Sequence, residues 1–253
     1  MTSLLKTDPD TYPYYCDGRP MADNTEQYRW IVIIKENLEI LFADRTDVFI
    51  AGDLFWLPVE DQTTVRNAPD VMVVFGRPKG KRLAYKQWEE DNISPQVVFE
   101  IRSPSNTPKE MQEKFDFYQQ YGVAEYYIYD PHKFTLDGWL RRYQTLEPIL
   151  NTNDWVSPRL GIRLIMTTEE LEIYHPDGRQ FLTSLELEQA REQAEHWAEQ
   201  AEQRAKQAEQ ARERTKIELE QERQQHRQLV KRLSNLSSEQ LKVLGIDPEM
   251  LNE

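Results

Sequence analysis

The sequence predicts an α/β domain followed by a long charged helix, and three observations support this prediction. Residues 94–127 have the pattern of a buried strand, a capped helix and a second strand. Short apolar runs, each bounded by turn residues, precede and follow this unit. From about residue 184 to residue 234 the chain is almost entirely Glu, Gln, Arg, Lys and Ala, with no Pro or Gly. We therefore expect one packed core of strands and helices, with a helical tail outside it.

The N-terminal part begins with an irregular arm at residues 1–22, which is rich in Tyr, Asp and Pro. Apolar spacing over residues 24–42 predicts a helix with Asn24 and Gln27 as a capping pair, although Trp30–Ile34 alone also fits a strand. The elements expected next are a strand at 48–51 continued by 54–57, a strand at 71–75 opened by Pro69-Asp70, a loop at 76–86 and a helical turn at 88–90.

The strand–helix–strand unit carries the most specific local signals. Residues 96–101 form an apolar run interrupted by one acid, Glu100. Thr107 precedes Glu110 by three residues, with Pro108 at the first helical position, which is a capping box. The helix is expected to bury Met111, Phe115 and Tyr118, to end at Gly122, and to be followed by a strand at 124–129. Further strands are expected at 134–140 and 160–165, with a closing meander of 171–174, a turn at 175–178 and residues 181–182.

Composition limits the classes of function. One cysteine, Cys16, excludes an internal disulfide and fits a reducing compartment. No signal peptide is evident, and the longest apolar run, Trp30–Ile34, is too short to span a bilayer, so we expect a soluble cytoplasmic protein that does not enter a membrane. The net charge of −13 argues against general affinity for nucleic acid, although a local basic patch is compatible with it.

The charged tail has a weak heptad seam that supports two interpretations. The seam residues follow steps of three and four and skip only Arg204: Leu187, Ala190, Ala194, Trp197, Ala201, Ala208, Ala211 and Thr215. One interpretation is a solvated single helix held by charge pairs four residues apart. The other is a coiled coil that joins two copies of the chain. A short apolar stretch at 236–244 suggests a terminal docking helix.

Three charged residues stand out against this apolar pattern: Asp70, Glu100 and Lys114. Acids at the ends of adjacent strands can converge on one hard cation such as Mg²⁺ or Mn²⁺. An ammonium beside them can orient water or stabilise a phosphoryl transition state. Taken singly, an aspartate after proline is usually a turn residue, and Lys114 is most often a solvated partner of Glu110. Glu100 is harder to explain, because acids are rarely buried without a partner.

The string that joins these residues resembles a known family. It reads PD-V-M-V-V-F-G, then V-V-F-E-I-R-S-P-S-N, then E-K-F-x-x-Y-x-x-Y-G-V-x-E-Y-Y-I-Y-D-P. This pattern resembles the bacterial Uma-type family of restriction-endonuclease-like proteins in the PD-(D/E)XK nuclease superfamily, over roughly Tyr12–Phe181. The resemblance implies a restriction-endonuclease-like core, with a mixed central sheet flanked by helices, and metal-dependent cleavage of phosphodiesters. The resulting division is an arm at 1–22, the nuclease-like domain at 23–183, a charged coiled-coil helix at 184–235 and a short segment at 236–253.

The resemblance also implies roles for individual residues. Asp70 matches the first acid of the motif and Glu100 the second, with the backbone carbonyl of Ile101 as a further ligand for Mg²⁺ or Mn²⁺. The superfamily usually has lysine where this chain has Arg102, and an arginine cannot exchange protons near neutral pH. The catalytic lysine is therefore expected at Lys114. Arg102 would bind the scissile phosphate or pair with an acid on a helix, and Asp53 and Glu36 are additional candidate acids.

A basic loop between the two acidic strands is the candidate for contact with the nucleic-acid backbone. Its positively charged residues are Arg77, Lys79, Lys81, Arg82 and Lys86. They could track phosphates or simply belong to a solvated loop.

Two functional hypotheses follow from these residues. The first is a Mg²⁺- or Mn²⁺-dependent endonuclease that hydrolyses phosphodiester bonds of DNA and forms a homo-oligomer, with the tail as the candidate interface. The alternative is a catalytically inactive nuclease-fold module that binds or oligomerises through its tail. The four histidines have no metal-ligand spacing, and the sequence contains no glycine-rich phosphate loop.

Overall fold

The computed structural model describes residue 22, residues 24–237, and residues 243 and 245. Most of the expected N-terminal arm with Cys16, and most of the expected segment 236–253 with its docking helix, therefore lie outside the described residues. The chain divides into two compact units, Met1–Leu187 and Glu188–Glu253. Among the described residues, the first unit contains all the strands, and the second contains most of the long helix.

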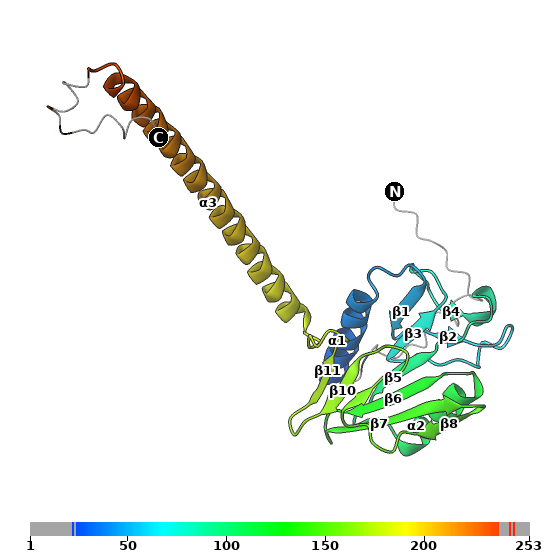
Figure 1. Cartoon of the computed structure of the whole chain (residues 1–253). Helices are drawn as coiled ribbons and strands as arrows, with labels where there is room; N and C mark the ends of the chain where they lie inside the picture. The colour runs from blue at the N-terminus through cyan, green and yellow to red at the C-terminus, as the bar shows by residue number, and fades with distance from the viewer. Residues whose placement is uncertain (1–21, 23, 238–242, 244, 246–253) are drawn as a thin grey trace, which may run out of the picture. The chain divides into compact units, whose positions relative to one another are not determined.

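A six-stranded mixed sheet lies at the centre of the first unit (Figure 1). Only β5 and β6 are parallel, with Val97 opposite Glu125, and helix α2 (Pro108–Gln120) connects them. The other neighbouring pairs of this sheet are antiparallel. In spatial order the strands are β1 (Val48–Gly52), β3 (Val71–Phe75), β5 (Val97–Ile101), β6 (Glu125–Asp130), β7 (Thr135–Arg142) and β8 (Thr145–Pro148).

Two hydrophobic clusters cover the two faces of the sheet, because successive strand residues point to opposite sides. Helix α1 (Thr25–Leu41) contributes Trp30, Ile34 and Leu38 to one cluster, which includes Val71 and Val73 of β3. Helix α2 contributes Tyr118 to the other, which includes Met72 and Val74 of the same strand. The strand β3 is therefore buried on both faces, as its continuous apolar run predicts.

Two smaller sheets complete the layers. Leu164, Leu171 and Ile173 of the three-stranded sheet pack into the α1 cluster. That sheet consists of β9 (Trp155–Val156), β10 (Arg163–Met166) and β11 (Leu171–Tyr174), all antiparallel. On the α2 side, β2 (Trp56–Leu57) pairs in parallel with β4 (Tyr85–Lys86), which leads into a 3₁₀ turn at Gln87–Glu89.

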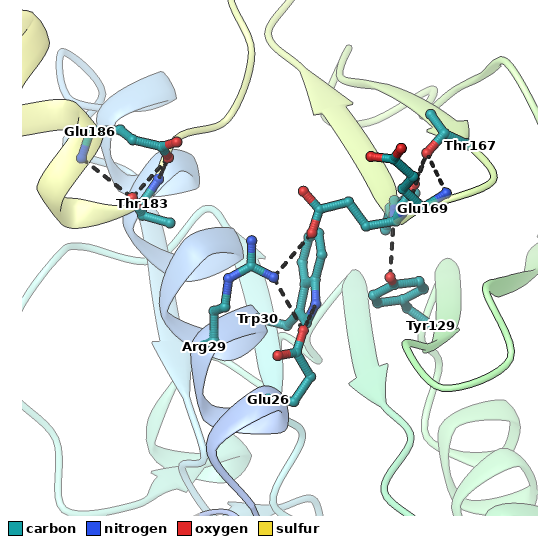
Figure 2. Close-up of polar contacts among 10 residues, drawn as sticks. Glu26, Arg29, Trp30, Tyr129, Thr167, Glu169, Thr183 and Glu186 are labelled. Carbon is teal, nitrogen blue, oxygen red and sulfur yellow. Dashed lines mark hydrogen bonds and ion pairs between the residues drawn. The ribbon is translucent and has the colours of Figure 1, made fainter.

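Figure 2 shows polar contacts around α1 and the start of β11, and the ion pair of Arg29 with Glu170 joins these two elements. The Arg29 guanidinium lies 3.1 Å from carboxylate oxygens of both Glu26 and Glu170. The indole Nε1 of Trp30 donates to Glu26 at 2.9 Å, and the Tyr129 hydroxyl accepts from the backbone N–H of Leu171 at 3.2 Å. Arg29, Trp30, Glu170 and Leu171 are among the residues that line a small cavity of about 70 Å³, which has room for only a few water molecules.

The start of helix α3 (Ser184–Leu233) is tied to α1 within the first unit. The buried Asn37 side chain donates to the Leu182 carbonyl at 2.7 Å and accepts from the Leu182 N–H at 3.2 Å. Glu36 accepts from the Ser184 hydroxyl at 2.7 Å, and Thr183 and Glu186 form a reciprocal cap, visible in Figure 2. The position where the tail begins is thus fixed by side chains of the core.

Several local predictions are confirmed. The helix at 24–42 is α1, so the strand interpretation of Trp30–Ile34 is wrong. Asn24 caps it by accepting from the Gln27 N–H at 2.8 Å. The capping box of Thr107 and Glu110 is present at the start of α2.

Other predictions need correction. Residues 54–57 do not continue β1, because the chain turns at Asp53, whose φ of 46° is left-handed, and Trp56 and Leu57 join the small parallel sheet. The loop at 76–86 contains β4 at its end. In α2 only Tyr118 is buried, while Met111 and Phe115 are half-buried, because the helix lies at the edge of the core. The strands β8 and β9 were not located by the pattern, since both are short and half-exposed.

Candidate active site

The sheet register brings Asp70 and Glu100 together where the start of β3 meets the end of β5, in the middle of the central sheet. Asp70 immediately precedes β3, and Glu100 is the second-last residue of β5. These strands are adjacent and antiparallel, with Val71 opposite Phe99, so the start of one meets the end of the other. Both acids are buried, with 5% and 2% of their surfaces exposed. The antiparallel pairing, rather than proximity in the sequence, brings these two carboxyl groups together.

The carboxyl group of Asp70 is bound to the end of the neighbouring strand. Its Oδ2 accepts from the backbone N–H of Ile101 at 2.6 Å, the residue directly after Glu100. Burial and the nearby Glu100 carboxylate raise the pKa of Asp70 to about 8, although Lys114, the Ile101 N–H and Gln27 act in the opposite direction. Two buried acids with a single compensating lysine form a site with a strong preference for additional positive charge.

Both oxygens of Glu100 accept hydrogen bonds from helix α2. The ammonium of Lys114 donates to Oε2 at 2.5 Å, and the hydroxyl of Tyr118 donates to Oε1. Lys114 and Tyr118 are four residues apart, so both lie on the same face of the helix. Burial and the charge of Glu100 raise the pKa of Tyr118 well above its usual value, which keeps the hydroxyl protonated as a donor.

Lys114 is the cation of the site. Burial alone would lower its pKa, but the carboxylates of Glu100, Asp70 and, more weakly, Asp53 raise it above the ordinary lysine value. About a quarter of the Lys114 side chain remains exposed, against 2% for Glu100. Lys114 is therefore the most exposed of the three charged side chains.

Gln27 is a site residue that the sequence interpretation did not identify as such. Its backbone N–H belongs to the α1 cap, whereas its side-chain amide donates to Asp70 at 3.3 and 3.4 Å. The only local signal was a glutamine in the first turn of an amphipathic helix, which normally indicates a cap. Gln27 is 7% exposed, and it restricts the orientation of the Asp70 carboxyl from the opposite layer of the domain.

The donor set fits a hard divalent cation. Mg²⁺ prefers oxygen ligands and commonly binds through one or two carboxylates while keeping several waters or substrate oxygens. Each carboxylate oxygen has a second lone pair, so the hydrogen bonds to Asp70 and Glu100 leave acceptor capacity. In the part of the chain that the structure describes, no group of three or more His, Cys, Asp or Glu side chains is placed to hold a metal ion.

Arg102 pairs with an acid at the end of the neighbouring strand. Its Nε lies 3.9 Å from Oδ2 of Asp130, which is the last residue of β6. Asp130 also accepts from the backbone N–H groups of His132 and Lys133 and so organises the following turn. The acid that pairs with Arg102 is thus on a strand and not on a helix.

The basic loop makes extensive contacts within the domain. Both Arg77 and Arg82 pair with Glu90, at 2.8 and 2.6 Å, and Arg82 also stacks 3.9 Å above the Phe49 ring. Lys79 donates to backbone carbonyls at the end of α1, and Lys86 pairs with Glu89 at 3.1 Å. These contacts explain the composition of the loop structurally, and phosphate contacts at Arg77, Lys79, Lys81 or Arg82 stay a prediction.

The two additional candidate acids have different surroundings. Asp53 acts electrostatically on Lys114, and its backbone N–H donates to the Asp70 carbonyl at 3.3 Å, so it borders the site. Glu36 instead contacts Ser184 at the start of α3. The structure therefore groups Asp53, and not Glu36, with Asp70 and Glu100.

The mixed sheet, its two acids on neighbouring strand ends and the lysine-bearing crossover helix define a restriction-endonuclease-like α/β core. Residues 14–169, more than half of the chain, match the Uma2 family, described as "Putative restriction endonuclease". The chain belongs to the Uma2 family.

Comparison with other known proteins gives the following. A similar solved structure is that of "a putative nuclease belonging to DUF820" from Anabaena variabilis ATCC 29413. It is 14% identical, the similarity covers 57% of this chain and 79% of that chain, and the TM-score is 0.37. No curated protein matches the sequence. Within the described ranges, no helix is both long enough and apolar enough to cross a membrane.

Proposed function

We propose that this protein is a Mg²⁺- or Mn²⁺-dependent endonuclease that hydrolyses phosphodiester bonds of DNA beside Asp70 and Glu100, where the start of β3 meets the end of β5. The observation that carries the proposal is the convergence of two buried carboxyl groups with the ammonium of Lys114. Restriction-endonuclease-like nucleases generally use divalent metals, and membership of the Uma2 family supports a nuclease.

Asp70, Glu100 and the backbone carbonyl of Ile101 would hold the metal ion. When bound, the ion supplies Lewis acidity toward a phosphoryl oxygen and lowers the pKa of a bound water. The chain itself supplies orientation: Gln27 and the Ile101 N–H hold Asp70, while Tyr118 holds Glu100. Because these donors come from α1, β5 and α2, the carboxyl groups are held in place before substrate arrives.

Lys114 would contact the scissile phosphate. Its raised pKa keeps the side chain as an ammonium near neutral pH, so it serves as a fixed positive charge and not as a base. The same charge compensates Glu100 in the metal-free protein. Lys114 is thus expected to bind Glu100 in the free enzyme and to share its hydrogen bonds with the phosphate during catalysis.

The test is cleavage of supercoiled plasmid DNA with Mg²⁺ or Mn²⁺. We expect Asp70→Asn, Glu100→Gln and Lys114→Met each to reduce the rate at least about 100-fold, the loss typical of removing one electrostatic group from an active site. Glu113→Gln and Lys109→Met, two exposed changes on the same helix, are the matched controls and should keep the wild-type rate. Wild-type protein that cuts no DNA with either metal would refute the proposal.

A second function is favoured by one specific observation. The chain has Arg102 where the superfamily usually has lysine, and Arg102 pairs with Asp130. A non-catalytic module would keep the fold without the metal site. Calorimetric titration with Mn²⁺ separates the two functions, because binding that disappears in both Asp70→Asn and Glu100→Gln supports the nuclease, and its absence from wild-type protein supports the module.

A further inference from the structure

The long helix α3 exposes apolar side chains that a solvated helix does not need. It has 50 residues, which corresponds to a length of about 75 Å, and none of them is buried. Leu185, Trp197 and Leu229 are 68%, 69% and 55% exposed, and Leu219 is 47% exposed. A helix held only by charge pairs would have no use for these side chains, whereas a helix with a partner would bury them.

Most of the apolar side chains of α3 lie on one face. At 100° per residue, Leu187, Trp197, Leu219 and Leu229 fall within one stripe, separated by alanines at 190, 194, 201 and 208. Ile217 lies on the opposite face, although it is exposed to the same extent as Leu219, 50% against 47%. The stripe continues beyond Thr215 to Leu219. This is a second consecutive step of four, at a point where the heptad pattern would have a step of three.

The charges of α3 are unequally distributed along its length. Residues 184–202 contain six glutamates and one basic residue, Arg191. Residues 214–232 contain six basic residues and three glutamates. A parallel pair of helices would place the acidic segment of one copy beside that of the other, which is repulsive. An antiparallel pair places each acidic segment beside a basic one.

We propose that α3 pairs with α3 of a second copy of this chain in an antiparallel arrangement, with the two-fold axis at Ala208. This register places Leu187 opposite Leu229 of the second copy and Trp197 opposite Leu219. Glu202 then lies at the same level along the pair as Arg214 of the second copy, and small residues at and around the axis permit close approach of the two helices. The N-terminal units of the two copies are consequently attached at opposite ends of the paired helices.

The first test measures how a glutamate on the apolar face of α3, or on its opposite face, changes the dissociation constant of the dimer. Sedimentation of the full chain should show a dimer, and Leu219→Glu should weaken it at least tenfold, because each dimer gains two carboxylates against Trp197. Ile217→Glu is the matched control and should change the dissociation constant less than twofold. A monomeric wild-type chain, or equal weakening by both variants, would overturn the proposal.

The second test determines the direction of pairing. With Cys16→Ser as background, spin labels are placed separately at Gln189→Cys and Gln207→Cys, both on exposed neutral positions away from the stripe. The antiparallel pair predicts labels about 55 Å apart at position 189 and less than about 20 Å apart at position 207. Short distances at both positions indicate a parallel pair and contradict the proposed arrangement.

Discussion

Removing the charge of Asp70 should stabilise the metal-free protein increasingly as the pH rises. The pKa of this carboxyl is about 8 in the folded protein, against an ordinary value of 3.8. Between these two values the folded chain binds the proton and the unfolded chain releases it, so the stability of the wild type falls as the pH rises. Asp70→Asn cannot titrate, and it keeps an oxygen that accepts from the Ile101 N–H.

The size of the effect follows from the shift in pKa. Each pH unit between the two pKa values changes the free energy of unfolding by about 1.4 kcal/mol. Raising the pH from 5 to 8 should therefore increase the stability of Asp70→Asn relative to wild type by roughly 3–4 kcal/mol, since the wild-type carboxyl is partly ionised at the upper end. A constant difference caused by the altered hydrogen bond cancels in this comparison.

Urea denaturation with EDTA present, followed by tryptophan fluorescence, measures this difference. The buried Trp30 and Trp56 report on the two opposite layers of the domain. Asp137→Asn, a change at an exposed aspartate of the same sheet, is the control and should track the wild type at every pH. A difference between Asp70→Asn and wild type that stays constant from pH 5 to 8 would refute the reasoning.

Three further predictions concern stability. Tyr118→Phe leaves the buried Glu100 without one donor and should lower the free energy of unfolding by about 1–3 kcal/mol, whereas Tyr126→Phe, which removes a buried hydroxyl that has no partner among the described residues, should be neutral or stabilising in the same urea assay. Asn37→Ala removes two hydrogen bonds to Leu182, two residues before α3 begins, and should cost about 2–3 kcal/mol by thermal unfolding; an unchanged melting temperature would contradict this. Gly138→Ala would place a methyl group 2.8 Å from a neighbouring isoleucine side chain, and calorimetry should show a loss of about 1–3 kcal/mol.

The sequence was most informative where structure is decided locally. The Thr107–Glu110 capping box located the start of α2 to the residue, because its hydrogen bonds join groups within one turn. Apolar runs located β3 and β5 because both are buried on their two faces. The same apolar context made Asp70 and Glu100 conspicuous as candidates for chemistry.

Contacts that depend on the folding of a loop, or on pairing with a later segment, had no comparable signal in the sequence. Glu90, the partner of Arg77 and Arg82, follows them closely in the chain, but only the folded loop directs both guanidinium groups toward it. Likewise, Trp56 and Leu57 do not continue β1, because they pair with β4, a strand that comes later in the chain. A strand of two residues has too few side chains to show a period of two.

By itself, the sequence determined the α/β class, the strand–helix–strand unit, the helical tail and the identity of the two acids, since each depends on residue type and spacing along one segment. The tertiary structure decided how those acids are held. Pairing of β3 with β5 placed Asp70 beside Glu100, packing of α1 brought Gln27 to Asp70, and packing of α2 directed Lys114 to Glu100. These relations join residues 14 to 43 positions apart in the chain, whose approach is set by burial of the core and not by any local pattern.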